Sequence, residues 1–314
     1  MEKYYFIDWL AFTVKETKLS VILEEIFKIR LEDWMPSKMQ LYGYQKSCTS
    51  NGITVLYNNT DGTDEQGIHC IVSGSAIRQY NKINSITGLI GRVKKIETAK
   101  FKRIDLTLDV VNASMLDFIK NSIIEEKYKT RFKKYTIIQE FNAKTNAKTA
   151  ETYYFGSRKS ENMIRIYDKA AEQKIEADIC RIEIELKKNS AHKVALDIIN
   201  EEDLQAITNG ILKNNLNFLE EKKKKNTARN HISSKWKSVI DYDSTAIYKS
   251  ATEKEETSLT SKANWLYKQI ARTYTMCKNT NLLTEKEILE YGYSKLTDID
   301  FATMAEILKE QTKK

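Results

Sequence analysis

Residues 101–109 read FKRIDLTLD, and residues 180–187 read CRIEIELK. In both stretches aliphatic residues recur at every second position, and the positions between them are mostly charged. Side chains on a β-strand alternate between its two faces, so this period of two predicts strands with one apolar and one polar face. Residues 163–169, MIRIYDK, show the same alternation. We therefore expect these three segments to be strands that bury one face in a common core.

Shorter elements surround these strands. Turn-forming residues at 58–62 favour a hairpin or meander between two of the further strands, which are expected at 53–57, 69–72 and 152–155. Apolar residues at helical spacing predict helices at 17–29, 86–96, 115–123, 194–199 and 211–219. The helix after Ser114 has an S-x-x-D relation to Asp117 that is typical of an N-cap. The sequence thus predicts an α+β fold, with an antiparallel β-sheet catalytic core flanked by helices.

A run of charged residues at 220–225, EEKKKK, interrupts the helical pattern. We interpret it as the boundary between a catalytic domain over residues 1–220 and a helical C-terminal region over residues 227–314, which could recognise an origin or bind a partner. Helices are expected in this region near 265–277, 284–290 and 301–309. The lysines of the run are either a solvated linker or contacts to a DNA backbone.

The composition excludes some classes of protein. The 314 residues include 51 Lys and Arg against 43 Asp and Glu, a formal charge of +8, which fits a polyanionic partner without identifying one. No apolar run approaches the roughly 18 residues that a membrane span needs, so a transmembrane protein is excluded. The start carries Glu2 and no small-residue cleavage site, and we expect a cytoplasmic location. Cys48, Cys70, Cys180 and Cys277 form no C-x-x-C pair, so we expect reduced, mostly buried thiols.

The polar faces of the three main strands carry the residues of chemical interest. They comprise Arg103, Asp105, Asp109, Arg165, Tyr167, Lys169, Arg181, Glu183, Glu185 and Lys187. If the strands are neighbours, these groups share one surface that could form the floor of an active site. Half-exposed antiparallel sheets also alternate charged and apolar residues without any function, so the pattern alone leaves a solvated face open.

Five sequence blocks favour the functional interpretation. In chain order they are IDWL at 7–10, SGSAIR at 73–78, RIDL at 103–106, TYYFGSRKS with RIYDK at 152–169, and RIEIE at 181–185. In this order and spacing they resemble the replication initiation factors of the Rep_trans family, which include rolling-circle plasmid initiators and relaxases of integrative conjugative elements. The resemblance covers residues 5–190, and none of the blocks falls in the C-terminal third.

The resemblance implies a DNA nicking and joining enzyme that initiates rolling-circle replication or conjugative transfer of a mobile element. In that family a tyrosine attacks a phosphodiester at the origin, forms a 5′-phosphotyrosine and frees a 3′-hydroxyl. The matching residue is Tyr167, whose phenol would be activated by the neighbouring cations Arg165 and Lys169. Tyr153 and Tyr154 are rivals that we interpret as packing residues of their strand. In its plasmid branch the family also implies a homodimer and a host helicase as partners. From the composition we expect no membrane partner.

Transfer of a phosphoryl group needs positive charge on its oxygens, which a divalent ion bound by carboxylates would supply. The candidate ligands are Asp105, Glu183 and Glu185, with Asp109 in reserve. Oxygen ligands favour Mg²⁺ or Mn²⁺, and the three histidines lack the spacing of a His-hydrophobe-His metal motif. Each acid could instead be a structural salt-bridge partner of Arg103 or Arg181.

The candidates for DNA contacts are Arg78, Arg103, Ser157, Arg158, Lys159 and Arg181. Residues 157–159 follow Gly156 in an expected turn, where backbone and basic side chains could hold a phosphate. A solvated hairpin tip is the alternative. Gly74, in the block that ends at Arg78, is expected to serve a close backbone approach.

Two other functions remain open. A metal-dependent hydrolytic nuclease would use the same acids but activate water instead of a tyrosine. A non-catalytic regulator would bind the origin and never cut it.

Overall fold

The chain consists of two compact units, Met1–Thr252 and Glu253–Lys314. The computed structural model describes residues 1–112, 114–173, 177–199, 203–222, 230–248, 263, 266–267, 270–296, 304–305 and 308. The division between the units lies further along the chain than the predicted boundary at 220–227, because residues 230–248 are part of the first unit: the Trp236 ring is fully buried, 4.9 Å from the ring of Phe218. Most of the expected helix at 301–309, Trp265 and lysines 223–225 lie outside the described residues.

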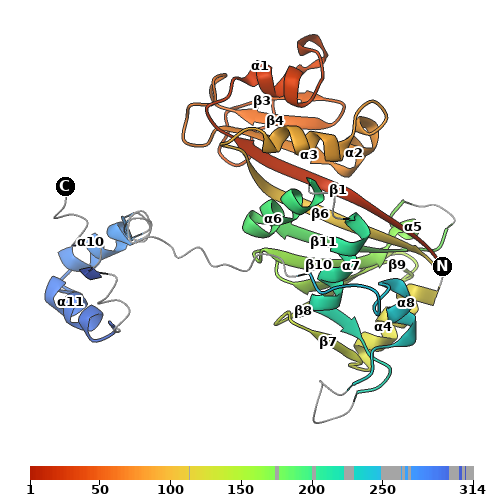
Figure 1. Ribbon diagram of the computed structural model, residues 1–314. Helices are drawn as coiled ribbons and strands as arrows, with labels where there is room; N and C mark the ends of the chain where they lie inside the picture. Colours follow the sequence, from red (N-terminus) through yellow and green to blue (C-terminus); the bar gives the residue numbers. More distant parts are fainter. Residues whose placement is uncertain are drawn as a thin grey trace. The chain divides into compact units, whose positions relative to one another are not determined.

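The described strands of the first unit form one large sheet and one small pair (Figure 1). The strands of the large sheet are β1 Glu2–Val14, β2 Met35–Ser37, β3 Lys46–Ser50, β4 Ile53–Tyr57, β5 Ile68–Ser73, β6 Lys100–Val111, β8 Tyr135–Phe141, β9 Lys148–Gly156, β10 Asn162–Asp168 and β11 Ile179–Lys187. Their order is β2-β3-β4-β5-β1-β6-β11-β10-β9-β8, and all neighbours are antiparallel. The separate pair is β7 Tyr128–Thr130 with β12 Leu216–Phe218. The three alternating segments are therefore adjacent strands, β6-β11-β10, as the sequence predicts.

Helices flank this sheet. In the first unit they are α1 Leu19–Val21, η1 Ile22–Ile26, η2 Leu31–Asp33, α2 Gly74–Tyr80, α3 Ile86–Lys94, α4 Ser114–Ile124, α5 Lys169–Gln173, α6 Lys188–Ile199, α7 Leu204–Asn215 and α8 Ser234–Val239. The second unit contains α10 Ala271–Asn279 and α11 Glu285–Tyr293, and a capping box between Thr284 and Glu287 begins α11. The predicted α+β class, with a helical C-terminal region, is confirmed. No helix among the described residues has the length and apolar character needed to cross a bilayer.

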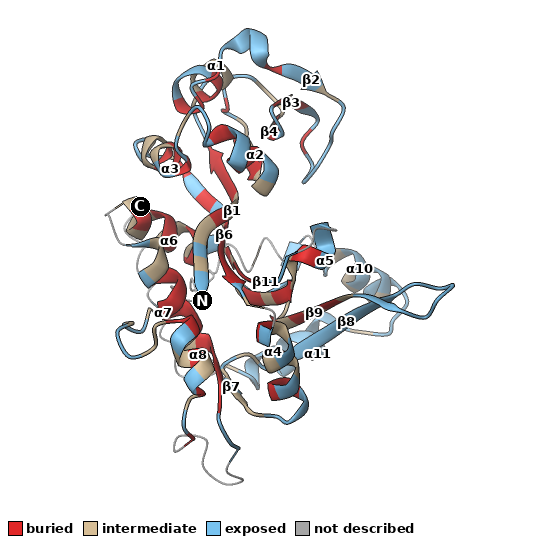
Figure 2. Cartoon of the chain, turned by 90° about the vertical axis from the view of Figure 1, so that its right-hand side faces the viewer, coloured by how far each residue is buried: buried red, intermediate tan, exposed pale blue. Residues whose placement is uncertain are grey.

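The apolar faces of the central strands form the core. Ile104, Leu106, Ile182 and Ile184 are all fully buried, as are residues of the helices on that side such as Val194 of α6. Figure 2 shows this burial continuing from β1 and β11 into α6 and α7. All four cysteines are free and three of them are buried, in agreement with the sequence. The helix expected over 211–219 ends early, at residue 215, because the next three residues pair with β7 instead.

Strand β1 is long, central and not predicted by a period of two. In its pairing with β6, Ile7 and Trp9 oppose consecutive residues, which leaves Asp8 as an extra residue in a β-bulge. A bulge reverses the alternation that follows it and re-aims the bulged side chain. Leu10 and Phe12 consequently face the core, and Asp8 faces the polar side of the sheet.

Candidate active site

The polar faces of β6, β11 and β10 meet at the centre of the sheet. Partners in an antiparallel pair point to the same side. Arg165 is opposite Glu183, and Tyr167 is opposite Arg181. On the other side of β11, Arg181 is opposite Asp109 and Glu185 is opposite Asp105. The fold thus brings the predicted residues onto one surface.

That surface is not a solvated face. Only 4% of Asp105, 3% of Glu183 and 5% of Arg181 is exposed, although these are charged residues. Burying a charge is costly unless it is paired and hydrogen-bonded, so charged side chains with so little exposure are typical of a built site. The ordinary alternation of a half-exposed sheet does not account for them.

The phenol of Tyr167 belongs to a hydrogen-bonded chain of three residues. Its hydroxyl donates to Glu183 Oε1 at 2.5 Å, and Arg165 donates to the other oxygen of the same carboxylate. The Arg165 Cζ atom lies 5.1 Å from the centre of the Tyr167 ring. Burial, and then the negative charge of Glu183, raise the pKa of Tyr167 well above its ordinary value. The phenol is therefore protonated at rest, with a carboxylate positioned to take its proton.

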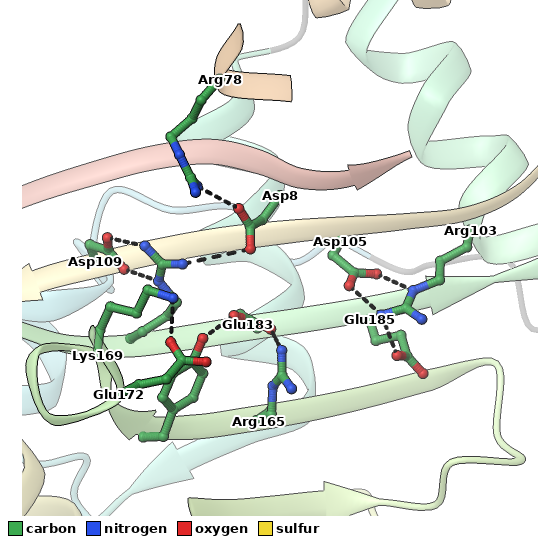
Figure 3. A network of polar contacts seen from close by, with 12 residues as sticks. Asp8, Arg78, Arg103, Asp105, Asp109, Arg165, Lys169, Glu172, Glu183 and Glu185 are labelled. Carbon is green, nitrogen blue, oxygen red and sulfur yellow. Dashed lines mark hydrogen bonds and ion pairs between the residues drawn. The ribbon is translucent and has the colours of Figure 1, made fainter. Parts of the chain in front are cut away.

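Lys169 is not on the strand face that its alternation predicts. Strand β10 ends at Asp168, and Lys169 is the first residue of α5. Its Nζ atom still lies 5.7 Å from the centre of the Tyr167 ring, and it is ion-paired with Glu172 (Figure 3). The helix start thus brings a second cation to the tyrosine by a route that a strand pattern does not show.

A second chain of contacts runs from Asp109 to Arg78 (Figure 3). Two nitrogens of Arg181 donate to the two oxygens of Asp109, both at 2.6 Å. Arg181 Nη1 also lies 3.6 Å from Asp8 Oδ2, and Arg78 Nη1 lies 3.6 Å from Asp8 Oδ1. Sequence reasoning missed Asp8, because only the bulge aims it at this site. Its place inside the block IDWL was the one available signal.

Gly74, the first residue of α2, is closely packed against this aspartate. A Cβ atom at position 74 would lie 2.2 Å from Asp8 Oδ1. No side chain fits there without displacing the carboxylate. The expected close approach at Gly74 is therefore real, and it is made to the Asp8 side chain.

Arg103 joins a third group, at the other end of the site. Its Nη2 atom lies 2.6 Å from Asp105 Oδ2 and 2.7 Å from Glu185 Oε2. Lys187 Nζ lies 2.5 Å from the other oxygen of Glu185. Burial raises the pKa of Asp105 to about 6, against the opposing effect of Arg103, and the neighbouring carboxylates of Glu185 and Glu183 add to the rise.

The described residues include no group of three or more His, Cys, Asp or Glu side chains arranged to hold a metal ion. Each of the four predicted ligands is ion-paired with an arginine: Asp105 and Glu185 with Arg103, Glu183 with Arg165, and Asp109 with Arg181. Mg²⁺ usually binds through one or two carboxylates together with substrate phosphates. Asp105 and Glu185 oppose each other in the sheet, so both could bind one ion, but their four oxygens are paired with Arg103 and Lys187, which the ion would have to displace. Glu183 and Asp109 are engaged by Tyr167 and Arg181.

The turn between β9 and β10 contains the predicted DNA contacts Ser157, Arg158 and Lys159. Lys187 Nζ donates to the carbonyl of Arg158 at 2.7 Å, which ties the turn to the end of β11. The Arg158 Cζ atom lies 5.8 Å from the ring centre of Tyr154, opposite Arg165 in the sheet. The Tyr153 side chain is buried in the core, as expected for a packing residue.

Comparison with known proteins gives consistent matches over two successive stretches of the chain. Residues 99–291 match the family described as replication initiation factor, Rep_trans, and residues 4–89 match the rolling circle replication initiation protein N-terminal domain. The candidate DNA relaxase NicK of Bacillus subtilis (strain 168) is 24% identical over 336 residues, which cover 96% of this chain and 91% of the relative. The structure of a rolling circle replication initiator protein from Geobacillus stearothermophilus is similar with a TM-score of 0.70 and 26% identity, over 80% of this chain and 100% of that one.

Proposed function

The chain belongs to the replication initiation factor family, and from this membership we propose that it nicks and rejoins one strand of origin DNA through a covalent bond to Tyr167. This step would initiate rolling-circle replication or conjugative transfer of a mobile element. The observation that carries the proposal is the 2.5 Å hydrogen bond from the Tyr167 phenol to the buried carboxylate of Glu183, within a group of arginines.

In the proposed reaction the phenolic oxygen of Tyr167 forms a bond to phosphorus, and the bond from phosphorus to the 3′ oxygen breaks. Glu183 takes the phenolic proton, and the departing 3′ oxygen takes a proton from water. The products are a 5′-phosphotyrosine and a free 3′-hydroxyl. Because the pKa of Tyr167 is raised, the phenol needs this base at the moment of attack. The new ester conserves the energy of the phosphodiester, so the reverse reaction reseals the strand without ATP.

The arginines supply positive charge for the transferred phosphate. Arg165 lies over the tyrosine ring, and Arg181 is held in one orientation by its two hydrogen bonds to Asp109. Preorganised cations of this kind stabilise charge that develops in the transition state. Asp105 and Glu185 would hold a divalent ion, Mg²⁺ or Mn²⁺, which when bound supplies Lewis-acid polarisation of the phosphate.

The remaining roles extend the same proposal to the DNA on either side of the nick. Arg78, Ser157, Arg158, Lys159 and Arg103 would contact its backbone. The C-terminal region over 227–314 would recognise the origin or bind a partner, since a shared chemical centre cannot distinguish one origin from another. A homodimer and a host helicase are the partners proposed with it.

A nicking assay tests the proposal directly. The protein is incubated with supercoiled plasmid that bears its own origin, with and without a chelator, and products are resolved in SDS to detect protein bound to DNA. Wild type should nick and form an adduct in a chelator-sensitive manner. Tyr167→Phe should lose both, while the matched control Tyr154→Phe keeps both.

Two outcomes would reject the mechanism. If Tyr167→Phe still nicks and wild type leaves no adduct, the protein is a hydrolytic nuclease. If wild type binds the origin but never nicks it with any divalent ion, the protein is a regulator.

A further inference from the structure

A cavity of about 750 Å³ lies on the polar face of the sheet, next to Arg103. Its floor includes Trp9 of β1 and His69 of β5, and its wall includes Tyr42 and Tyr44 from the loop between β2 and β3. The rings of Tyr44 and His69 are stacked at 18°, with centroids 6.1 Å apart. This volume is in the range of pockets that take small organic ligands, and four of the lining residues carry aromatic rings.

The backbone of Tyr42, in the cavity wall, has an unfavourable conformation. It is 69% exposed, yet its backbone has a φ of +54°, a left-handed conformation that bulky residues rarely adopt. Gln66 stabilises that backbone by donating to the Tyr42 carbonyl at 3.1 Å. The ring lies with its edge to His69, at 84° and 5.6 Å between centroids. A strained residue that presents an exposed aromatic ring beside a cavity is typical of a binding site.

His69 makes the floor polar without making it charged. Burial, with the charge of Lys102, lowers the pKa of His69 to about 4, so the imidazole is neutral at neutral pH. Its Nδ1 atom lies 2.9 Å from the Thr13 hydroxyl. A neutral ring in an aromatic group suits a neutral, flat ligand.

Cations dominate the charge of the lining. They are Lys15, Lys102, Arg103, Lys187 and Lys188, against the single acid Glu65. An aromatic floor with cations around it combines surfaces for stacked bases and for phosphates, which is how proteins bind single-stranded nucleic acid. A lipid or a purely apolar ligand would not need this set of charges.

The cavity shares two residues with the site around Tyr167. Arg103 lines it, stacks at 4.5 Å over Trp9 and is ion-paired with Asp105. Lys187 also lines it, and lies four residues along β11 from Glu183. At about 3.4 Å per residue this is about 14 Å, the length of about four stacked nucleotides at 3.4 Å each.

We propose that this cavity binds an unpaired base of the nicked strand, within about four nucleotides of the scissile phosphate. The base stacks on Tyr42 and the aromatic floor, and the lysines contact the neighbouring phosphates. The inference rests on the proposed function, because that function supplies the single-stranded DNA.

Binding to oligonucleotides tests the cavity separately from the chemistry. The full chain is used with the substitution Tyr167→Phe throughout, so that no covalent bond can form. Fluorescence anisotropy measures its affinity for a short oligothymidylate and for an abasic oligonucleotide of the same length. We expect oligothymidylate to bind at least about fivefold more tightly, the lower limit for stacking of one base on an aromatic ring.

Substitutions at Tyr42 should remove that preference when they remove the aromatic ring and keep it when the ring is retained. Tyr42→Ala should abolish the preference, and Tyr42→Phe should keep it, since both retain the Cβ atom and the same backbone strain. The exposed Ile83, outside the cavity, provides the control Ile83→Ala, which should change neither affinity.

Equal affinities for the two oligonucleotides when Tyr42 is intact, or a preference that survives Tyr42→Ala, would overturn the proposal. So would displacement of oligothymidylate by free thymidine monophosphate at equal concentration, which would indicate a site for free nucleotides. Neither result depends on nicking. Conversely, if Tyr167→Phe still nicks DNA, the tyrosine mechanism is refuted. A base preference that depends on Tyr42 would in that case still support binding in the cavity.

Discussion

Replacement of Glu183 by glutamine separates the proposed base from the rest of the site. Glutamine has the same size, and its carbonyl can still accept the hydrogen bond that now joins Tyr167 to Glu183 at 2.5 Å. It cannot take the proton at neutral pH. A positioned general base contributes about 10²- to 10⁴-fold in rate, or about 2.7 to 5.4 kcal/mol of activation free energy. We therefore expect the single-turnover nicking rate to fall at least about 100-fold, without weaker binding of the origin.

The same change should weaken the fold only moderately. Glu183 is buried, and Glu183→Gln leaves Arg165 without its counter-charge, although the Arg165 side chain is 37% exposed and the glutamine can still accept hydrogen bonds. The free energy of unfolding should fall by about 1–3 kcal/mol, as measured in urea. Glu172→Gln is the matched control, because Glu172 is an exposed acid paired with the other cation near Tyr167.

The assay follows nicked plasmid and covalent adduct in a single turnover with protein in excess. Glu172→Gln should react at nearly the wild-type rate. If Glu183→Gln also nicks within about threefold of wild type, the carboxylate does not remove the phenolic proton, since a general base contributes far more than this.

Other changes test the packing and electrostatics around the site. Gly74→Ala would place a Cβ atom 2.2 Å from Asp8 Oδ1, so it should destabilise the fold by about 1–3 kcal/mol in urea and slow nicking; unchanged values would show that Asp8 moves freely. Burial raises the pKa of Asp105 to about 6 in the folded protein, so folding favours the protonated carboxyl. The contribution of Asp105 to the free energy of unfolding is therefore complete below a pH of about 4 and is lost as the pH rises through about 6. Unfolding at several pH values should show this loss in wild type and not in Asp105→Asn. Trp236→Ala should cost about 3–5 kcal/mol, because the indole is fully buried on Phe218, and a cost below about 1 kcal/mol would contradict its packing on the first unit.

Alternation of apolar and polar residues predicted a strand reliably where one face of the strand is apolar, and the other polar, along its whole length. Strands β6, β10 and β11 follow their predicted segments to within a few residues, and their apolar sides are buried. Strand β8 was not predicted. All seven of its residues are exposed, so the strand has no buried apolar face that an alternating pattern could reveal. In β1 the bulge at Asp8 changes which residues face the core, and no single alternating pattern fits the whole strand.

The site, too, was predicted from the sequence only in part. The sequence identified Tyr167, its flanking cations and the acids of β6 and β11 as one group. It assigned Glu183 to a metal, whereas the structure places its carboxylate on the Tyr167 hydroxyl. Nothing in the order of residues along the chain indicates that contact, because it depends on which residues of β10 and β11 are opposite each other.

The sequence by itself determined the polar and apolar faces of the central strands, because side-chain direction on a strand is a local property of the backbone. It also determined the α+β class and the order of the blocks that carry the family resemblance. Only the tertiary structure decided the register that sets Tyr167 against Glu183, and the approach of Asp8 to both Arg181 and Arg78. Register and the position of a bulge are fixed by pairing between segments far apart in the chain, and that pairing is settled only when the whole core packs.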